Sequence, residues 1–300
     1  MPDWPTTGET WATTVAACEA GVSLERWERG IAHARAAGAV GVATELVGRL
    51  LICLVVGPTP ADEALVRIDE ALDEIGTSAV LEADAQMARG ILWSMQGRGD
   101  EGYELVEAGL RTIRESGQIL SAAGMAQRLE LAERLRGGTD VEQRIERVVR
   151  QGYDELVRLG DRSYLSTLAL ILAYCLQRQG RAAEARELCE VARERTLAGD
   201  LVNFIYLDVV EGELAAMEGR LDEAERHARR AVERAETTDF VFLRGLRSRG
   251  ALGAVLARRG KTEEAAVVAA HAVGLHASKG DVAGVRLLRE QFEKAGVDVT

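Results

Sequence analysis

The stretch Gly219-Arg-Leu-Asp-Glu223-Ala224 recurs in this chain as Gly180-Arg-Ala-Ala-Glu184-Ala185 and as Gly260-Lys-Thr-Glu-Glu264-Ala265. The glycine that opens it belongs to a series of six, spaced 40, 41, 42, 39 and 41 residues apart: Gly57, Gly97, Gly138, Gly180, Gly219 and Gly260. A repeat of this length is typical of stacked helix pairs, because each pair buries its apolar face only against its neighbours. The spacing therefore predicts a helical array rather than a compact enzyme core.

A second series of turns interleaves with the first, at Gly38, Gly76, Gly117, Gly160-Asp161, Gly199-Asp200, Thr238-Asp239 and Gly280-Asp281. In such turns a glycine supplies the left-handed residue that ends one helix, and an aspartate accepts from the free amides that begin the next. Thr139 and Glu142 have the spacing of a capping box. Each interval holds one helix, so we expect about fourteen helices between Val22 and Ala295, in about seven antiparallel pairs.

Two kinds of helix alternate along the chain. Residues 164–176 are apolar on most sides, which is typical of a helix packed on several faces. The helices that follow the Gly-Arg turns are amphipathic, as at Ala265, Val268 and Ala272. We therefore predict that the first kind forms the inner, concave wall of an all-α superhelix and that the second kind forms its outer layer.

Composition and charge exclude several classes of protein. Apolar residues make up 47% of the chain and aromatic residues 4%, so Ala, Leu and Val must build a core of close-packed helices. A net charge of −11 repels phosphate backbones, and we expect no direct nucleic-acid binding. The four cysteines have no metal-ligand spacing, which favours a reducing, cytoplasmic location. The first residues do not form a signal peptide, and no apolar stretch is long enough to span a membrane.

The pattern divides the chain into three parts: an N-terminal extension or partial cap at residues 1–21, a helical repeat domain at 22–295 and a C-terminal tail at 296–300. Trp4 and Trp11 lie in the extension, where such large rings favour a partner surface. At the other end the last helix turns Leu288 and Phe292 inward and charged residues outward, which predicts a solubilising cap.

Several further motifs resemble those of a known class: Gly57-Pro-Thr-Pro-Ala-Asp-Glu-Ala64, Gly152-Tyr-Asp-Glu-Leu156, Gly160-Asp-Arg-Ser-Tyr-Leu-Ser-Thr167, Thr238-Asp-Phe240 and Lys279-Gly-Asp281. With the Gly-x-x-x-Glu-Ala turns, they make the chain resemble tetratricopeptide (TPR) proteins in a long-helix form. More specifically, it resembles the C-terminal TPR region of large bacterial regulators that join a cyclase-like or DNA-binding domain to a signal-transduction ATPase.

This resemblance implies a right-handed α-α superhelix, a TPR-like solenoid with a repeat of about 40 residues. It also implies a role in signalling or transcription regulation, a protein or peptide partner, and an attached or separate ATPase or cyclase domain. The 34 arginines against 3 lysines are compatible with a bacterial source.

No set of residues has the pattern of a catalytic, cofactor or metal site. Gly260-Lys-Thr262 matches the end of a phosphate-binding loop, but that motif needs a glycine where the chain has Val255, so the repeat turn explains it. His271 and His276 are five residues apart and point to different faces of a helix, unlike paired metal ligands. We predict a protein that is not an enzyme and that needs no cofactor.

The inner helices carry a few polar and aromatic residues that could hold a partner in the concave groove: Tyr164, Tyr174, Gln177, Asn203, Tyr206, Arg244 and Arg247. Tyr and Arg are the residue types that anchor interfaces, and Asn can hold a peptide backbone. Ordinary packing, or a hydrogen bond to the next repeat, is the alternative for each. We predict an interaction or sensing module that binds a protein or peptide; the alternative is a receptor for a signalling peptide or small molecule inside the superhelix.

Overall fold

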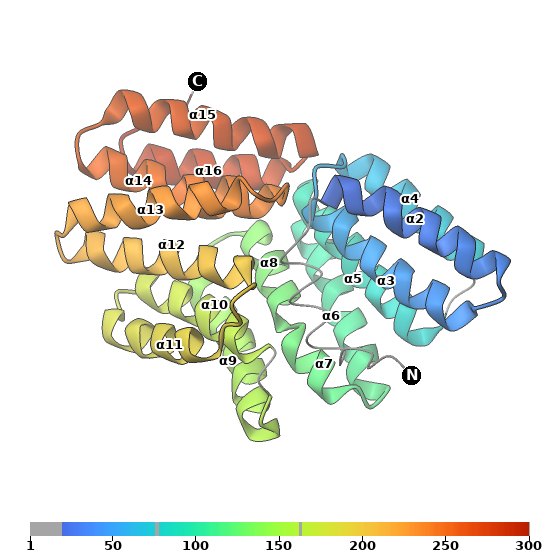
Figure 1. Cartoon of the computed structure of the whole chain (residues 1–300). Helices are drawn as coiled ribbons and strands as arrows, with labels where there is room; N and C mark the ends of the chain where they lie inside the picture. The colour runs from blue at the N-terminus through green and yellow to red at the C-terminus, as the bar shows by residue number, and fades with distance from the viewer. Residues whose placement is uncertain (1–19, 76–77, 162–163, 300) are drawn as a thin grey trace.

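The computed structural model describes residues 20–75, 78–161 and 164–299, and every regular element within these ranges is a helix (Figure 1). The elements are α2 (Ala20–Ala36), α3 (Val40–Val56), α4 (Ala61–Ile75), α5 (Ala79–Met95), α6 (Gly99–Glu115), α7 (Ile119–Gly124), α8 (Ala126–Arg136), α9 (Val141–Leu159), α10 (Leu165–Arg178), α11 (Ala182–Arg195), α12 (Leu201–Met217), α13 (Leu221–Ala235), the π-helical segment η1 (Leu243–Arg249), α14 (Gly250–Arg258), α15 (Thr262–Lys279) and α16 (Val282–Lys294).

Two of the long helices are divided into two elements: a turn residue, Met125, separates α7 from α8, and the π-helical η1 continues directly into α14 after Arg249. With each of these counted once, the described residues form fourteen long helices in an α-solenoid, as the repeat spacing predicts. The predicted N-terminal extension, including Trp4 and Trp11, lies outside the described residues except for the start of α2. Nowhere in the described ranges is a helix both long and apolar enough to cross a membrane.

The six glycines of the first series have the left-handed backbone that the sequence predicts, with one exception; in the second series Gly199 is not left-handed, and Gly76 lies outside the described residues. Gly97, Gly138, Gly180, Gly219 and Gly260 all have φ between 74° and 90°, the left-handed region that ends a helix at low cost only for glycine. The sixth, Gly57, is extended, with φ −81° and ψ −176°. It precedes a proline, and the proline ring excludes helical backbone at the residue before it.

Asp200 and Asp281 cap α12 and α16 as predicted, whereas Asp161 bonds to Tyr164 just before α10 and the predicted capping box does not form. Asp161, Asp200 and Asp281 each accept a hydrogen bond from the backbone N–H three residues ahead, at 2.7, 3.1 and 2.7 Å. Helix α9 instead begins after Asp140, a left-handed residue with φ 56° that makes no side-chain cap. The Glu142 carboxylate instead accepts hydrogen bonds from Arg134 of α8 and Arg178 of α10.

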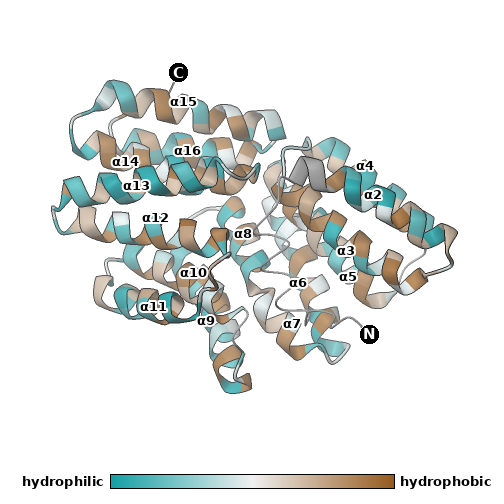
Figure 2. Ribbon diagram, in the orientation of Figure 1, coloured by the Kyte–Doolittle hydropathy of each residue, from teal (hydrophilic) through white to brown (hydrophobic). Residues whose placement is uncertain are grey.

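Inner and outer helices differ in hydropathy as the sequence predicts. Figure 2 colours the outer helix α13 mostly hydrophilic, whereas the inner helix α3 is largely hydrophobic. In α10, twelve of fourteen residues are buried, but in the outer helix α11 only Ala185, Cys189 and Ala192 are. Alanine at the buried positions of the outer layer lets the helices approach closely.

The two ends of the solenoid meet, which the sequence does not predict. Lys279, at the end of α15, is fully buried and donates to the carbonyl oxygens of Leu54 and Thr59, both at 2.6 Å. Arg286 of α16 donates to the Leu135 carbonyl at 2.9 Å, and α16 packs against α5 and α8. Figure 1 shows α15 and α16 beside the first helices at the top of the molecule. Helix α16 is therefore a closing element as well as a cap.

Candidate functional site

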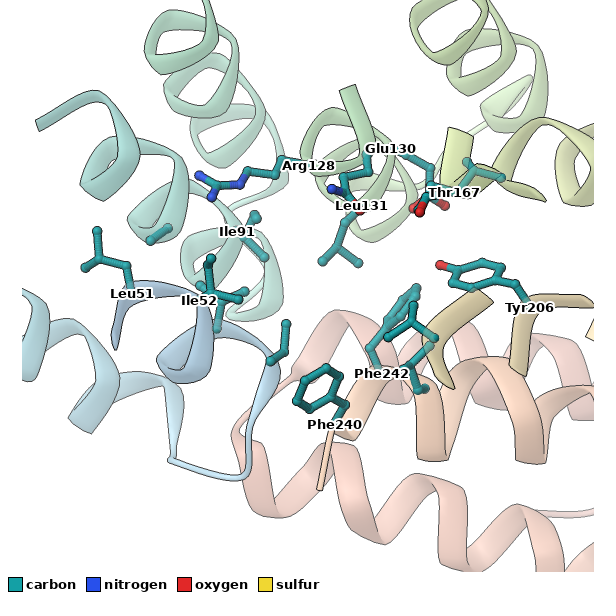
Figure 3. Close-up of a pocket in the computed structure, with 17 residues that line it drawn as sticks. Leu51, Ile52, Ile91, Arg128, Glu130, Leu131, Thr167, Tyr206, Phe240 and Phe242 are labelled. Atoms are coloured by element: carbon teal, nitrogen blue, oxygen red, sulfur yellow. The ribbon is translucent and has the colours of Figure 1, made fainter. Parts of the chain in front are cut away.

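The inner helices enclose an apolar cavity of about 140 Å³. Its wall is formed by α3, α5, α8, α10, α12 and the start of η1, all of them first helices of a pair. Figure 3 shows Ile52, Leu131, Phe240, Phe242 and Tyr206 around a common space. We call this space the apolar cavity; Glu130 and Arg128 are the charged side chains in its wall.

A second, larger hollow of about 720 Å³ opens farther along the same inner wall. It lies among the C-terminal ends of α8, α10 and α12, the start of α9, and helices α14 and α16. Its wall is rich in charged and amide groups: Arg134, Glu142, Gln177, Arg178, Glu213, Arg258, Arg286, Glu290, Gln291 and Lys294. We call this hollow the polar cavity. Its volume lies within the usual range of about 300–1,000 Å³ for ligand pockets.

Arg247 lies between residues of the two cavities and is only 1% exposed. Its guanidinium carbon is 4.1 Å from the ring centre of Tyr174, which lines the polar cavity, and 5.2 Å from that of Tyr206, which lines the apolar cavity. Nη2 donates to Glu130 Oε1 at 2.6 Å and Nε to the Tyr206 hydroxyl at 3.3 Å. A cation that stacks on aromatic rings and pairs with a carboxylate tolerates burial. We call Arg247 the partition, because it contacts residues in the walls of both cavities.

The π-helical segment η1 has an identifiable cause in a histidine of the next helix. The His276 ring packs so closely on Gly245 that a Cβ there would lie 2.5 Å from ring atoms. The wider π turn frees a backbone N–H, and Leu246 N donates to His276 Nε2 at 3.2 Å. The other ring nitrogen, Nδ1, faces Asp281 Oδ2 at 2.7 Å. Both nitrogens of this buried histidine are therefore engaged within the fold.

A chain of ion pairs links the partition to the polar cavity. Arg134 donates to Glu130 at 2.6 Å and to Glu142 at 3.0 Å, and Arg178 donates to Glu142 at 2.7 Å. Burial opposes ionisation of Glu142, but Arg134 and Arg178 outweigh it and lower the pKa of Glu142 to about 2. Burial likewise opposes ionisation of Glu130, and Arg247 with Arg134 holds its pKa below the ordinary value. Both carboxylates are therefore charged at neutral pH.

Four of the predicted groove residues lie at this site. Tyr174 and Gln177 line the polar cavity, Tyr206 lines the apolar cavity, and Arg247 separates the two. Gln177 donates to Glu213, whose pKa burial raises. Residues from three different inner helices are therefore brought together around one guanidinium.

The other three predicted residues make contacts within the fold. Asn203 is fully buried, donates to Ser166 of the preceding repeat at 2.9 Å and accepts from Thr167 at 3.0 Å. Arg244 donates to Glu236 at 2.8 Å. The Tyr164 ring fits against Gly124, where an added Cβ would lie 2.3 Å from it. Among the described residues, none of these three lines either cavity. Asn203 only contacts Thr167, which lines the apolar cavity.

The sequence did not reveal three charged members of the site: Glu130, Arg134 and Glu142. Glu130 and Arg134 lie on a helix whose charges are spaced like those of a solvent-exposed face, and a single sequence shows nothing of their burial. One usable signal is their spacing of four residues, which allows an ion pair along one helix. The pairing of Glu130 with Arg247 spans 117 residues and depends on the curvature of the solenoid.

Two further sets of residues are committed to structural contacts. Lys261 of the Gly-Lys-Thr turn donates to both carboxylate oxygens of Glu225 at 2.8 Å, as expected for a repeat turn. Asp208, Glu211 and His227 are close enough together to share a cation. However, Arg230 and Arg234 also bind Asp208, and their two positive charges disfavour a metal ion there.

Comparisons with known proteins place the fold. No protein-family model and no curated protein matches the sequence. Similar solved structures include the apo form of the quorum sensor NprR from B. thuringiensis (TM-score 0.51, 14% identity, covering 93% of this chain and 82% of that one). They also include NprR in complex with its cognate peptide NprX (0.61, 15%, 92% and 84%) and a Rap protein complexed with Competence and Sporulation Factor (0.56, 14%, 92% and 87%). At these identities the likeness shows the fold alone, a TPR-like helical solenoid.

Proposed function

We propose that this chain is a binding module of a regulatory system and that it takes up a peptide, or a peptide segment of a protein, inside the superhelix. The observation that carries the proposal is the polar cavity of about 720 Å³ on the inner wall. The cavity is open, rimmed by donors and acceptors from α10, α12, α14 and α16, and large enough for several residues of an extended peptide. Inner walls of helical solenoids are also the surfaces on which such folds bind peptides.

The solved structures of similar fold support this choice of ligand. One holds NprR with its cognate peptide, and another holds a Rap protein with Competence and Sporulation Factor. Both alignments cover 92% of this chain. We therefore favour a peptide over a small molecule.

The interior chemistry supports binding rather than catalysis. Glu130, Glu142, Arg134 and Arg247 are engaged with each other, and the carboxylates have lowered pKa values. A general base works best with a pKa near the working pH. The network instead provides fixed charges that orient a ligand, so we propose a non-enzymatic role.

The resemblance to the TPR regions of cyclase and ATPase regulators supports a place in signalling. We propose that residues 22–295 form the sensing unit and that it acts on an attached or separate ATPase or cyclase domain. Occupation of the inner wall would change the pitch of the superhelix, because the same helices line the cavities and form the repeat stack.

Filling the polar cavity tests the proposal. Ala254 lies half-buried in its wall on α14, and Ala254→Trp places an indole in the space. Native mass spectrometry with an equimolar randomised heptapeptide mixture should show peptides retained by the unaltered protein and lost in this variant. Ala270→Trp, on the exposed face of α15, is the matched control and should retain them.

The outcomes separate peptide binding from the alternative ligand. Equal retention by Ala254→Trp and the unaltered protein would move the site away from the polar cavity. If no peptide is retained but a metabolite extract raises the melting temperature, the alternative of a small-molecule receptor holds.

A further inference from the structure

The wall of the polar cavity carries more basic than acidic side chains. Five are basic (Arg134, Arg178, Arg258, Arg286 and Lys294) and three are acidic (Glu142, Glu213 and Glu290). The chain as a whole has a net charge of −11, so this local excess of two positive charges reverses the overall sign. A concave surface of one sign concentrates ligands of the opposite sign.

The acidic side chains are already occupied within the wall. Glu142 binds Arg134 and Arg178, and Glu290 accepts from Arg286 at 3.1 Å. The third acid, Glu213, accepts a hydrogen bond from Gln177; burial raises its pKa, while Arg178, Arg247 and Arg258 oppose that rise. Glu142 and Glu290 therefore pair with three of the five basic side chains, and Arg258 and Lys294 are the two that remain without an ion pair within the described residues.

Arg258 and Lys294 lie on the adjacent helices α14 and α16. Both are exposed, and within the described residues neither has a carboxylate at ion-pair distance. Most arginines of this chain do have one, for example Arg259 with Asp222 at 2.6 Å, next to Arg258 in the sequence. Two exposed cations that line the same cavity and have no ion pair within the described residues are suited to a ligand that carries the negative charge itself.

We propose that the rim formed by Arg258 and Lys294 selects a carboxylate on the bound peptide, so that the module prefers acidic peptides. This step rests on the proposed function, because it assumes that a peptide occupies the polar cavity. The guanidinium offers paired N–H donors that match a carboxylate, and the ammonium adds a second charge. The carboxylate is either an acidic side chain or the C-terminus of the peptide, which share this chemistry.

The test uses the full chain and two randomised heptapeptide mixtures, one with a free C-terminal carboxylate and one with a C-terminal amide. Peptides that stay bound after desalting are identified by mass spectrometry. We expect peptides of net charge −2 to be enriched about tenfold over those of net charge +2, since each rim charge contributes a few-fold. Arg258→Gln combined with Lys294→Gln should reduce the enrichment to less than twofold.

A control variant that loses the same number of positive charges elsewhere distinguishes an effect of the rim residues from an effect of the protein's net charge. Arg111→Gln with Arg289→Gln removes two exposed cations that line neither cavity, and it should keep the tenfold enrichment. If acidic peptides are enriched only in the mixture with a free C-terminal carboxylate, the group bound by the rim is the peptide C-terminus. If they are enriched in both mixtures, the group is an acidic side chain. Bound peptides without charge preference, or equal preference in the rim variant, would overturn the selection while leaving peptide binding intact. No bound peptide at all would overturn both.

Discussion

Lys279 closes the solenoid, and its replacement measures what the closure contributes. The helical partner of the Leu54 carbonyl would be the N–H of residue 58, but that residue is Pro58, which has none. The Lys279 ammonium supplies the missing donor and also binds the Thr59 carbonyl. Burial lowers the pKa of Lys279 to about 8, so the group is still mostly charged at pH 7.

Lys279→Met keeps an unbranched side chain but removes both hydrogen bonds. Hydrogen bonds from a charged donor contribute about 1.5–3 kcal/mol each, and relief from burying an ammonium offsets part of the loss. We expect a net destabilisation of about 2–4 kcal/mol, which lowers the melting temperature by about 4–10 °C. Amide hydrogen exchange should become faster at the end of α3 and the start of α4, because these segments lose their contact with the last repeats.

The control for this experiment is Arg289→Met, at an exposed position on α16 where the described structure gives the side chain no ion pair. It should leave the melting temperature within about 1 °C. If Lys279→Met is as stable as the unaltered protein, or if exchange at residues 50–64 is unchanged, the ends of the solenoid do not depend on this contact.

Two further variants test the ion-pair network and the helix packing. The pKa of Glu142 is about 2 in the fold and about 4.5 ordinarily. The ionised carboxylate therefore stabilises the folded state fully above pH 4.5, and this contribution is lost as the pH falls toward 2. That loss is on the order of 3 kcal/mol, and Glu142→Gln should flatten this part of a plot of melting temperature against pH; an unchanged slope would contradict the assignment. A Cβ at Gly102 would lie 2.3 Å from the Gly90 carbonyl, so Gly102→Ala should cost about 1–3 kcal/mol in urea unfolding, whereas a neutral effect would show that α5 and α6 separate freely.

The features predicted from the sequence are those that local physical chemistry determines. A left-handed glycine at the turns and an aspartate cap such as Asp200 act within a few residues, so the helices and their order follow from the chain alone. Arg247 stands out in the sequence as a polar residue on an apolar helix; in the fold it is buried and pairs with Glu130, and its role in holding a partner stays a prediction. The alternation of apolar and amphipathic helices likewise predicted which helices form the inner wall.

The features that were missed depend on contacts between distant parts of the chain. Glu130 meets Arg247 across 117 residues, and Lys279 meets Leu54 across 225. Both contacts are set by how far each repeat rotates from the last, which the repeat pattern does not specify. The capping box was wrong because Glu142 gains more from two buried guanidinium groups than from a backbone N–H at the helix start.

The most direct test of the account is a crystal structure of the protein with a retained heptapeptide. We predict that the peptide lies along the polar cavity between α10, α12, α14 and α16, with a carboxylate within ion-pair distance of Arg258 or Lys294. A peptide seated instead on the outer wall, formed by α9, α11, α13 and α15, would contradict the central claim that the inner wall is the binding surface.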